Sequence, residues 1–127
     1  MANTPSFVQH SLDLFAPLGE VTARRLFGGH GLYQGGIIFG LLDDGELFLK
    51  TDDLCRPAFK AAGGTCWTYP SPEGPMETSY FRPPAEALED ADSMRKWFDL
   101  AVAASRRAVA KKKKPARKQK PAKKKKR

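Results

Sequence analysis

Apolar positions at helical spacing mark the beginning and the end of the globular part of the sequence. Thr4-Pro5 supplies a hydroxyl cap and a proline at the first helical position, and Pro17 and Gly19 end the segment. The apolar positions between them are Phe7, Val8, Leu12 and Phe15. Near the other end, Pro83-Pro84 precedes a helical stretch that we expect from about Ala85. Its apolar positions recur at i, i+3, i+4, i+7 and i+8, as Met94, Trp97, Phe98, Ala101 and Val102.

Short apolar runs separated by glycine turns follow the first helix. Residues 21–27 lead into the glycine cluster Gly28-Gly29-His30-Gly31 and continue through Leu32-Tyr33. We interpret the cluster as a bulge or tight bend. Gly35-Gly36 and Asp44-Gly45 then separate residues 37–42 and 46–50, and such dipeptides between apolar runs are strong hairpin signals. The pattern predicts a three-stranded meander.

The second half predicts a helix, a hairpin and the final helix. Asp52-Asp53 caps a helix through about Ala62, with Pro57 making its first turn short or irregular and Gly63-Gly64 ending it. Strands over 66–69 and 77–81 are joined by a turn rich in proline. The order α-β-β-β-α-β-β-α predicts a two-layer α+β domain, with one antiparallel five-stranded sheet covered on one face by helices.

Charge divides the chain into two parts. Residues 1–104 hold 8 basic and all 14 acidic residues, and residues 105–127 hold 14 basic residues and no acidic one. The net charges are −6 and +14, which gives the overall +8. We therefore expect an α+β domain over 1–104 and a lysine-rich tail over 105–127. Like charges, two prolines and the lack of core-forming side chains predict that this tail is disordered in isolation.

The tail is the strongest functional signal. Lysine runs broken by Pro-Ala resemble histone H1-like tails, which coat polyanions without reading sequence. Lysine outnumbers arginine, so we expect contacts to the nucleic-acid backbone rather than to bases. If about 5–8 cations engage phosphates, log K should fall with log salt at a slope near −5 to −7. The expected nucleic-acid-binding residues are Lys111, Lys112, Lys113, Lys114, Arg117, Lys118, Lys120, Lys123, Lys124, Lys125, Lys126 and Arg127.

Other readings of the charge stay open. The tail could serve solubility alone, and membrane binding is disfavoured because no apolar face accompanies the lysines. In an alternative hypothesis the body is a protein-interaction module, and the basic tail docks on acidic protein surfaces, including those of the body itself. Arg24 and Arg25 are the candidates in the body for an anion or partner contact, against solvated charges or a salt bridge.

The sequence offers little sign of catalytic chemistry. The glycine cluster lacks the Lys-Ser/Thr of a nucleotide site, and His10 and His30 have no recognisable ligand spacing. We interpret Cys55 and Cys66 as small buried hydrophobes rather than nucleophiles. We therefore expect no enzyme activity, no cofactor and no metal site. No apolar run approaches the ~18 residues of a membrane helix, and no secretory signal precedes Arg24. A cytoplasmic location is the expectation, and association with the nucleoid is left open.

Several motifs resemble the N-terminal domain of the TfoX/Sxy family. The main one covers residues 21–33 (VTARRLFGGHGLY), with support from Leu47-Phe48-Leu49-Lys50, Trp67-Thr68-Tyr69, Thr78-Ser79-Tyr80-Phe81 and Trp97. The resemblance spans roughly residues 5–104. It implies a two-layer α+β fold, a bacterial setting and a link to natural-competence genes, where family members assist transcription, which adds a protein partner in transcription to the expectations. Longer family regulators carry a second helical domain where this chain has lysines.

Overall fold

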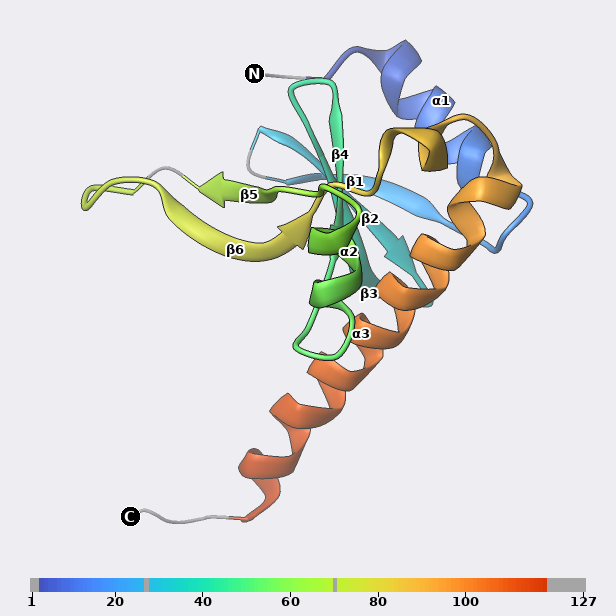
Figure 1. Ribbon diagram of the computed structural model, residues 1–127. Coiled ribbons are helices and arrows are strands. Elements are labelled where there is room, and N and C mark those ends of the chain that lie inside the picture. The colour runs from blue at the N-terminus through green and yellow to red at the C-terminus, as the bar shows by residue number, and fades with distance from the viewer. Residues whose placement is uncertain (1–2, 27, 70, 119–127) are drawn as a thin grey trace.

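The computed structural model describes residues 3–26, 28–69 and 71–118, and of 112–118 it describes the helical backbone alone. Along the chain the elements are α1 (Pro5–Phe15), β1 (Thr22–Leu26), β2 (Gly29–Gln34), β3 (Ile37–Asp43), β4 (Glu46–Lys50), α2 (Arg56–Ala61), β5 (Cys66–Tyr69), β6 (Met76–Phe81), the 3-10 helix η1 (Ala85–Leu88) and α3 (Ala91–Lys118). They form an α+β fold built on one antiparallel sheet (Figure 1). The predicted fold class is confirmed.

The sheet has six strands rather than the expected five. Their order is β1-β2-β3-β4-β6-β5, and every neighbouring pair is antiparallel. The difference arises at the glycine cluster, where the single expected strand over 21–33 is in fact the hairpin β1–β2. Gly28 has φ +79°, in the left-handed region that glycine adopts without steric cost, so the chain can reverse direction there.

Both hairpins of the predicted meander are confirmed. Gly35 and Gly36 connect β2 to β3 with φ values of 61° and 80°. Asp44 and Gly45 connect β3 to β4 with φ values of 52° and 77°. Two successive residues with positive φ give the turn whose twist matches that of the flanking strands. These dipeptides therefore determine the register of the meander.

The observed start of α1 agrees with the start predicted from the sequence, whereas those of α2 and α3 differ from it. The Thr4 hydroxyl accepts a hydrogen bond from the Phe7 amide at 3.1 Å, as expected of the cap of α1. Asp52 instead accepts from the amides of Leu54 and Cys55 in a turn, and α2 begins at Arg56. The final α-helix begins at Ala91 rather than near Ala85, because η1 comes first and Asp90 then accepts a bond from the Ser93 amide.

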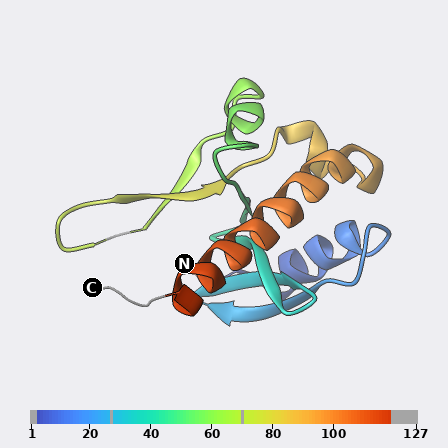
Figure 2. The ribbon, with the colours of Figure 1, turned by 90° about the horizontal axis from the view of Figure 1, so that it is seen from below.

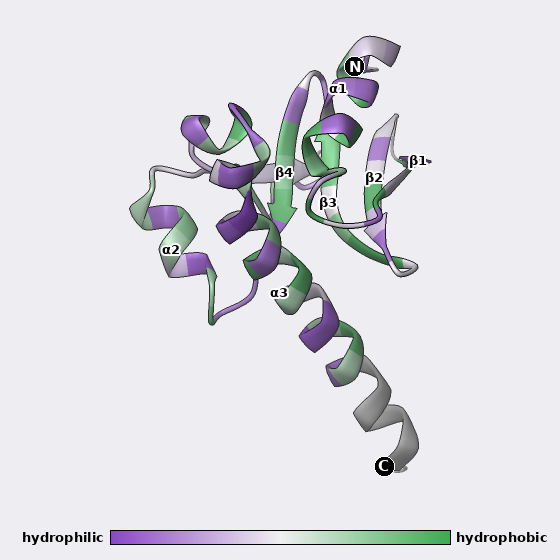
Figure 3. Ribbon diagram, turned by 90° about the vertical axis from the view of Figure 1, so that its right-hand side faces the viewer, coloured by the Kyte–Doolittle hydropathy of each residue, from purple (hydrophilic) through white to green (hydrophobic). Residues whose placement is uncertain are grey.

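The core lies between the sheet and the helices. Phe15 of α1, Phe39 of β3 and Phe98 of α3 pack with ring centroids 5.3–5.6 Å apart. Phe59 of α2 meets Trp97 of α3 at 4.9 Å. The predicted stripe of α3 faces this core, as Met94, Trp97, Phe98 and Ala101 are all buried. Figure 3 shows the hydrophobic strands β3 and β4 beside the first half of α3.

α3 crosses the expected domain boundary without a break. Ser105 is buried and its hydroxyl donates to the Ala101 carbonyl at 2.8 Å. The helix continues from residue 105 to Lys118, and its first turn beyond residue 104 contacts the body through Arg106 and Arg107. The disorder of the tail stays a prediction. Residues 119–127 lie outside the described residues. The division into two domains stays a prediction.

Candidate nucleic-acid interface

The C-terminal part of α3 carries the cations that the sequence singled out. The helix runs for 28 residues, and its last turns project beyond the rest of the fold (Figure 1). Lys111, Lys112, Lys113, Lys114, Arg117 and Lys118 belong to these turns. Lys120 and the cations from Lys123 to Arg127 lie outside the described residues. At 1.5 Å per residue, Lys118 lies about 20 Å along the axis from Ser105. Cations near a helix C-terminus also interact favourably with the backbone dipole.

A cleft of about 350 Å³ lies at the base of this cationic segment. It forms where the end of β4 and the turn before α2 face the side of α3. Four cations and two carboxylates line it. The lining residues are Lys50, Thr51, Asp52, Asp53, Leu54, Arg56, Ser79, Arg107, Ala108 and Lys111. We call it the cationic cleft.

Arg107 fastens α3 to the body at this cleft. Its guanidinium donates two hydrogen bonds to Asp52, from Nε to Oδ2 at 2.5 Å and from Nη2 to Oδ1 at 2.9 Å. These bonds, together with the bond from the Cys55 amide, hold the pKa of Asp52 at about 2, although partial burial opposes the shift. The carboxylate thus stays ionised across the physiological range and joins α3 to the turn before α2.

The other two body cations of the cleft are held in place by neighbours. Arg56 donates from Nε to the Thr51 hydroxyl and from Nη1 to Asp53, both at 3.0 Å. Lys50 donates to the Ser79 hydroxyl at 2.9 Å and lies over the ring of Tyr80. Burial raises the pKa of Tyr80 to about 12, so its hydroxyl adds no negative charge beneath Lys50. The cleft therefore presents positioned cations.

The structure does not bring Arg24 and Arg25 to this cleft. Both are exposed on the edge strand β1, and Arg24 lies over the ring of Tyr33 at 5.5 Å. Arg106 of α3 donates to Gln34, the residue after Tyr33. Neighbouring residues of a strand point to opposite faces, so Arg24 and Arg106 occupy opposite faces of β2. Within the described residues neither Arg24 nor Arg25 forms an ion pair.

The other residues that the sequence singled out, Gly29, His30 and Cys55, have packing or hydrogen-bonding roles in the fold. A Cβ on Gly29 would lie 2.3 Å from the Leu42 carbonyl oxygen, so this glycine permits close strand pairing. His30 Nδ1 accepts a hydrogen bond from the Asn3 amide at 3.0 Å. Cys55 belongs to the core, and burial raises the pKa of its thiol, as expected of an unreactive cysteine.

Residues 3–26, 28–69 and 71–118 contain no group of three metal-ligating side chains. Among the helices of the same residues, none has the length and apolar character needed to cross a membrane.

The cleft itself was not predicted from the sequence. Lys50, Arg56, Ser79 and Arg107 come from four separate elements or connections, and only the tertiary fold brings them together. The one sequence signal was the pair Asp52-Asp53, which we interpreted as a helix cap. Asp52 does accept amide hydrogen bonds, but its two strongest contacts are with Arg107, 55 residues away.

The comparisons with known proteins agree with the fold. The family model of the TfoX N-terminal domain matches residues 13–105, which is most of the chain. The chain therefore belongs to the TfoX N-terminal domain family. No curated protein matches it closely enough to add a second comparison. The family match ends at Ser105, where the buried part of α3 gives way to the cationic turns.

Proposed function

We propose that this chain is a nucleic-acid-associated accessory protein without catalytic activity, in which the TfoX-type domain holds a cationic helix against phosphates. One observation carries the proposal. α3 passes without interruption from the buried core into a segment whose charged residues are all basic, while all 14 acidic residues lie in the body. This segregation concentrates positive potential at one end of the molecule, which favours a polyanionic partner.

The chemistry of the segment supports backbone contact. Ten of the twelve cations in residues 111–127 are lysines, which act as point charges and lack the bidentate fork that reads guanine. The cationic cleft continues this surface onto the body through Lys50 and Arg56. We therefore propose binding that is independent of sequence and strongly dependent on salt.

Membership in the family gives the proposal its biological direction. By likeness to TfoX-type regulators, we propose that the body contacts a protein partner in transcription while the cationic helix keeps the complex near DNA. A cytoplasmic, bacterial setting belongs to the same proposal. In this arrangement affinity for nucleic acid comes from α3 and the residues after it, and selectivity for a partner comes from the body.

The test compares three full-length chains on a labelled random duplex by fluorescence anisotropy. In the first variant the twelve cations of 111–127 become glutamine, which keeps helix propensity and removes charge. In the second, Arg24 and Arg25 become glutamine. We expect the first variant to lose binding and the second to bind like the unmodified chain.

Two outcomes would overturn the proposal. Loss of binding only in the Arg24→Gln, Arg25→Gln chain would move the interface to the edge of the sheet. Weak binding by the unmodified chain would favour the protein-interaction module instead. The feature that fits such a module is the β5–β6 hairpin, which extends away from the helices (Figure 2) and carries Met76, 55% exposed, and Tyr69, 40% exposed.

A further inference from the structure

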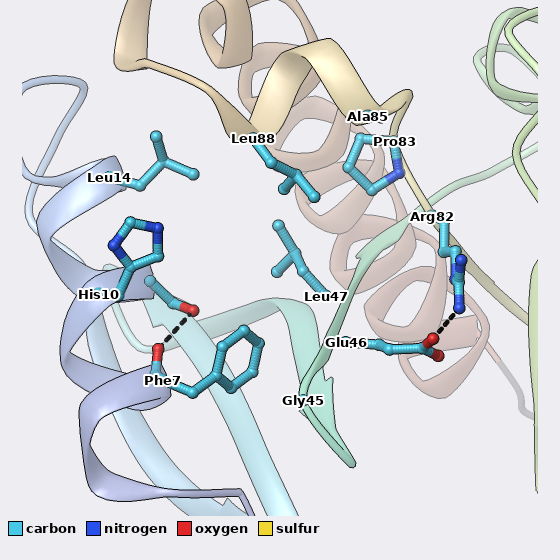
Figure 4. Close-up of a pocket in the computed structure, with 11 residues that line it drawn as sticks. Phe7, His10, Leu14, Gly45, Glu46, Leu47, Arg82, Pro83, Ala85 and Leu88 are labelled. Atoms are coloured by element: carbon cyan, nitrogen blue, oxygen red, sulfur yellow. Dashed lines mark hydrogen bonds and ion pairs between the residues drawn. The ribbon is translucent and has the colours of Figure 1, made fainter.

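A second cavity, separate from the cationic cleft, lies between α1, the start of β4 and the segment that leads to η1 (Figure 4). Its volume is about 350 Å³, within the ~300–1,000 Å³ of small-molecule sites. It shares no lining residue with the cleft. Apolar side chains from three parts of the chain form most of its wall, namely Phe7, Leu14, Leu47, Pro83 and Leu88.

Of these five apolar side chains, Leu88 is the one that is exposed. Leu88 of η1 is 41% exposed, and it is one of four large apolar side chains that are exposed in the described residues, together with Leu54, Tyr69 and Met76. Figure 4 shows Leu14, Leu47 and Leu88 converging on a common space. Covering this surface with the hydrocarbon part of a ligand would remove apolar area from water and so stabilise the bound state.

The polar groups of the cavity favour an anionic end on that ligand. Arg82 pairs with Glu46 through Nη2 alone, so its other N–H groups are left to donate. His10 of α1 also lines the cavity, and its ring takes part in no hydrogen bond with the described residues. Ser11 contributes nothing further, because its hydroxyl already donates to the Phe7 carbonyl at 2.9 Å. Figure 4 places His10 at one side of the cavity and the Arg82–Glu46 pair at the other, with Leu47 and Leu88 between them. Arg82 also lies over the ring of Phe48 and is therefore the positioned cation of the cavity.

We propose that this cavity binds a small amphipathic carboxylate, with its hydrocarbon part against Leu14, Leu47 and Leu88 and its carboxylate on Arg82. The site is independent of nucleic-acid binding. Glu46 competes with the ligand for Arg82. Removing the charge of Arg82 should therefore weaken ligand binding, and removing the charge of Glu46 should strengthen it.

The test uses the full-length protein and decanoate as the probe, at concentrations at which decanoate forms no micelles. Decanol and decyltrimethylammonium serve as probes of equal chain length with neutral and positive ends. Amide chemical shifts in two-dimensional NMR report both the site and the dissociation constant. We expect saturable shifts in residues of the cavity, and tighter binding of decanoate than of either control.

The variants then separate the anionic contact from apolar adhesion. Arg82→Gln should weaken decanoate binding about 3–10-fold, since a charge-assisted hydrogen bond at a half-exposed site is lost. Glu46→Gln should strengthen it, and Arg95→Gln, an exposed arginine on α3 away from the cavity, should leave it unchanged. The proposal is wrong if decanoate gives no saturable shifts, if decanol binds as tightly, or if Glu46→Gln weakens binding.

Discussion

At the residue scale, Asp52 links local and tertiary structure. It caps the turn before α2 through the amides of Leu54 and Cys55, and it accepts two hydrogen bonds from Arg107 of α3. The side chains of Asp52 and Arg107 are 26% and 40% exposed, so solvent screens much of their attraction. The geometry is bidentate, which is the arrangement in which a partly exposed pair still contributes to stability.

Arg107→Gln tests this pair through its pH dependence. Asp52 has its pKa lowered to about 2 in the folded state, so its contribution is present above the unfolded value near 4 and is lost as pH falls toward 2. We expect the substitution to lower the free energy of unfolding by about 1 kcal/mol at pH 7, after allowance for screening. In urea titrations the difference from the unmodified chain should shrink below pH 4. A difference that stays constant from pH 7 to pH 2.5 would contradict this assignment.

Gly29→Ala tests the structural reading of the glycine cluster. A Cβ at this position would lie 2.3 Å from the Leu42 carbonyl oxygen, a backbone atom that cannot move without disturbing the β2–β3 pairing. We expect a loss of about 2–3 kcal/mol in thermal or denaturant unfolding. Gly19→Ala is the matched control, since the nearest atom there is the flexible end of Gln34 at 3.1 Å. Equal effects of the two substitutions would show that the close strand approach is not the reason for glycine.

At the element scale, turn chemistry explains which strands were predictable. Gly35-Gly36 and Asp44-Gly45 have one common structural solution between apolar runs, and the structure adopts it. The segment Gly28-Gly29-His30-Gly31 can form either a bulge within one strand or a chain reversal between two strands. The local sequence does not distinguish these two conformations. Pairing of β1 with β2 decides the matter, because it places Leu26 opposite Gly29.

The end of α3 shows the same limit of local reasoning. The apolar stripe fades after Val102, which led us to end the domain at residue 104. Contacts made by polar side chains extend the helix instead: the Ser105 hydroxyl with Ala101, Arg106 with Gln34 at 2.9 Å, and Arg107 with Asp52. Periodicity detects apolar packing, and it does not detect an ion pair between residues that are distant in sequence.

Truncations on either side of these contacts test this view of the helix. A chain ending at residue 104 loses Ser105 and Arg107, whereas one ending at residue 110 keeps both. We expect the shorter chain to be less stable by about 1–2 kcal/mol, seen as a lower melting temperature. Equal melting temperatures would show that the turns after Ala104 add nothing to the body, in agreement with the simpler boundary drawn from the sequence.

At the scale of the whole molecule, one continuous helix joins an acidic body to a basic segment. The pair between Arg107 and Asp52 is one place where the two charges already meet within the chain. Further pairing of the lysines with body carboxylates would compete with nucleic acid for the same cations. The direction of α3 opposes this, because its last turns lead away from the body (Figure 1).

The sequence shows the composition of the cationic segment but not the shape of the surface around it. Charge counting alone identified the lysine run, since no folding is needed to see 14 cations without an acidic neighbour. The cationic cleft and the cavity lined by Leu14, Leu47 and Leu88 could be recognised only from the three-dimensional structure. His10, Glu46 and Arg82 are far apart in sequence and line one cavity because α1, the start of β4 and the segment after β6 lie around it.

The salt dependence of duplex binding tests the central claim most directly. Log K against log salt concentration, measured by anisotropy on the full-length chain, should have a slope near −5 to −7 on unrelated duplex sequences. The chain with glutamine at the twelve basic positions of 111–127 should show a slope near zero. A slope shallower than about −1 for the unmodified chain, or a steep slope retained by the glutamine chain, would contradict a cationic helix as the nucleic-acid interface.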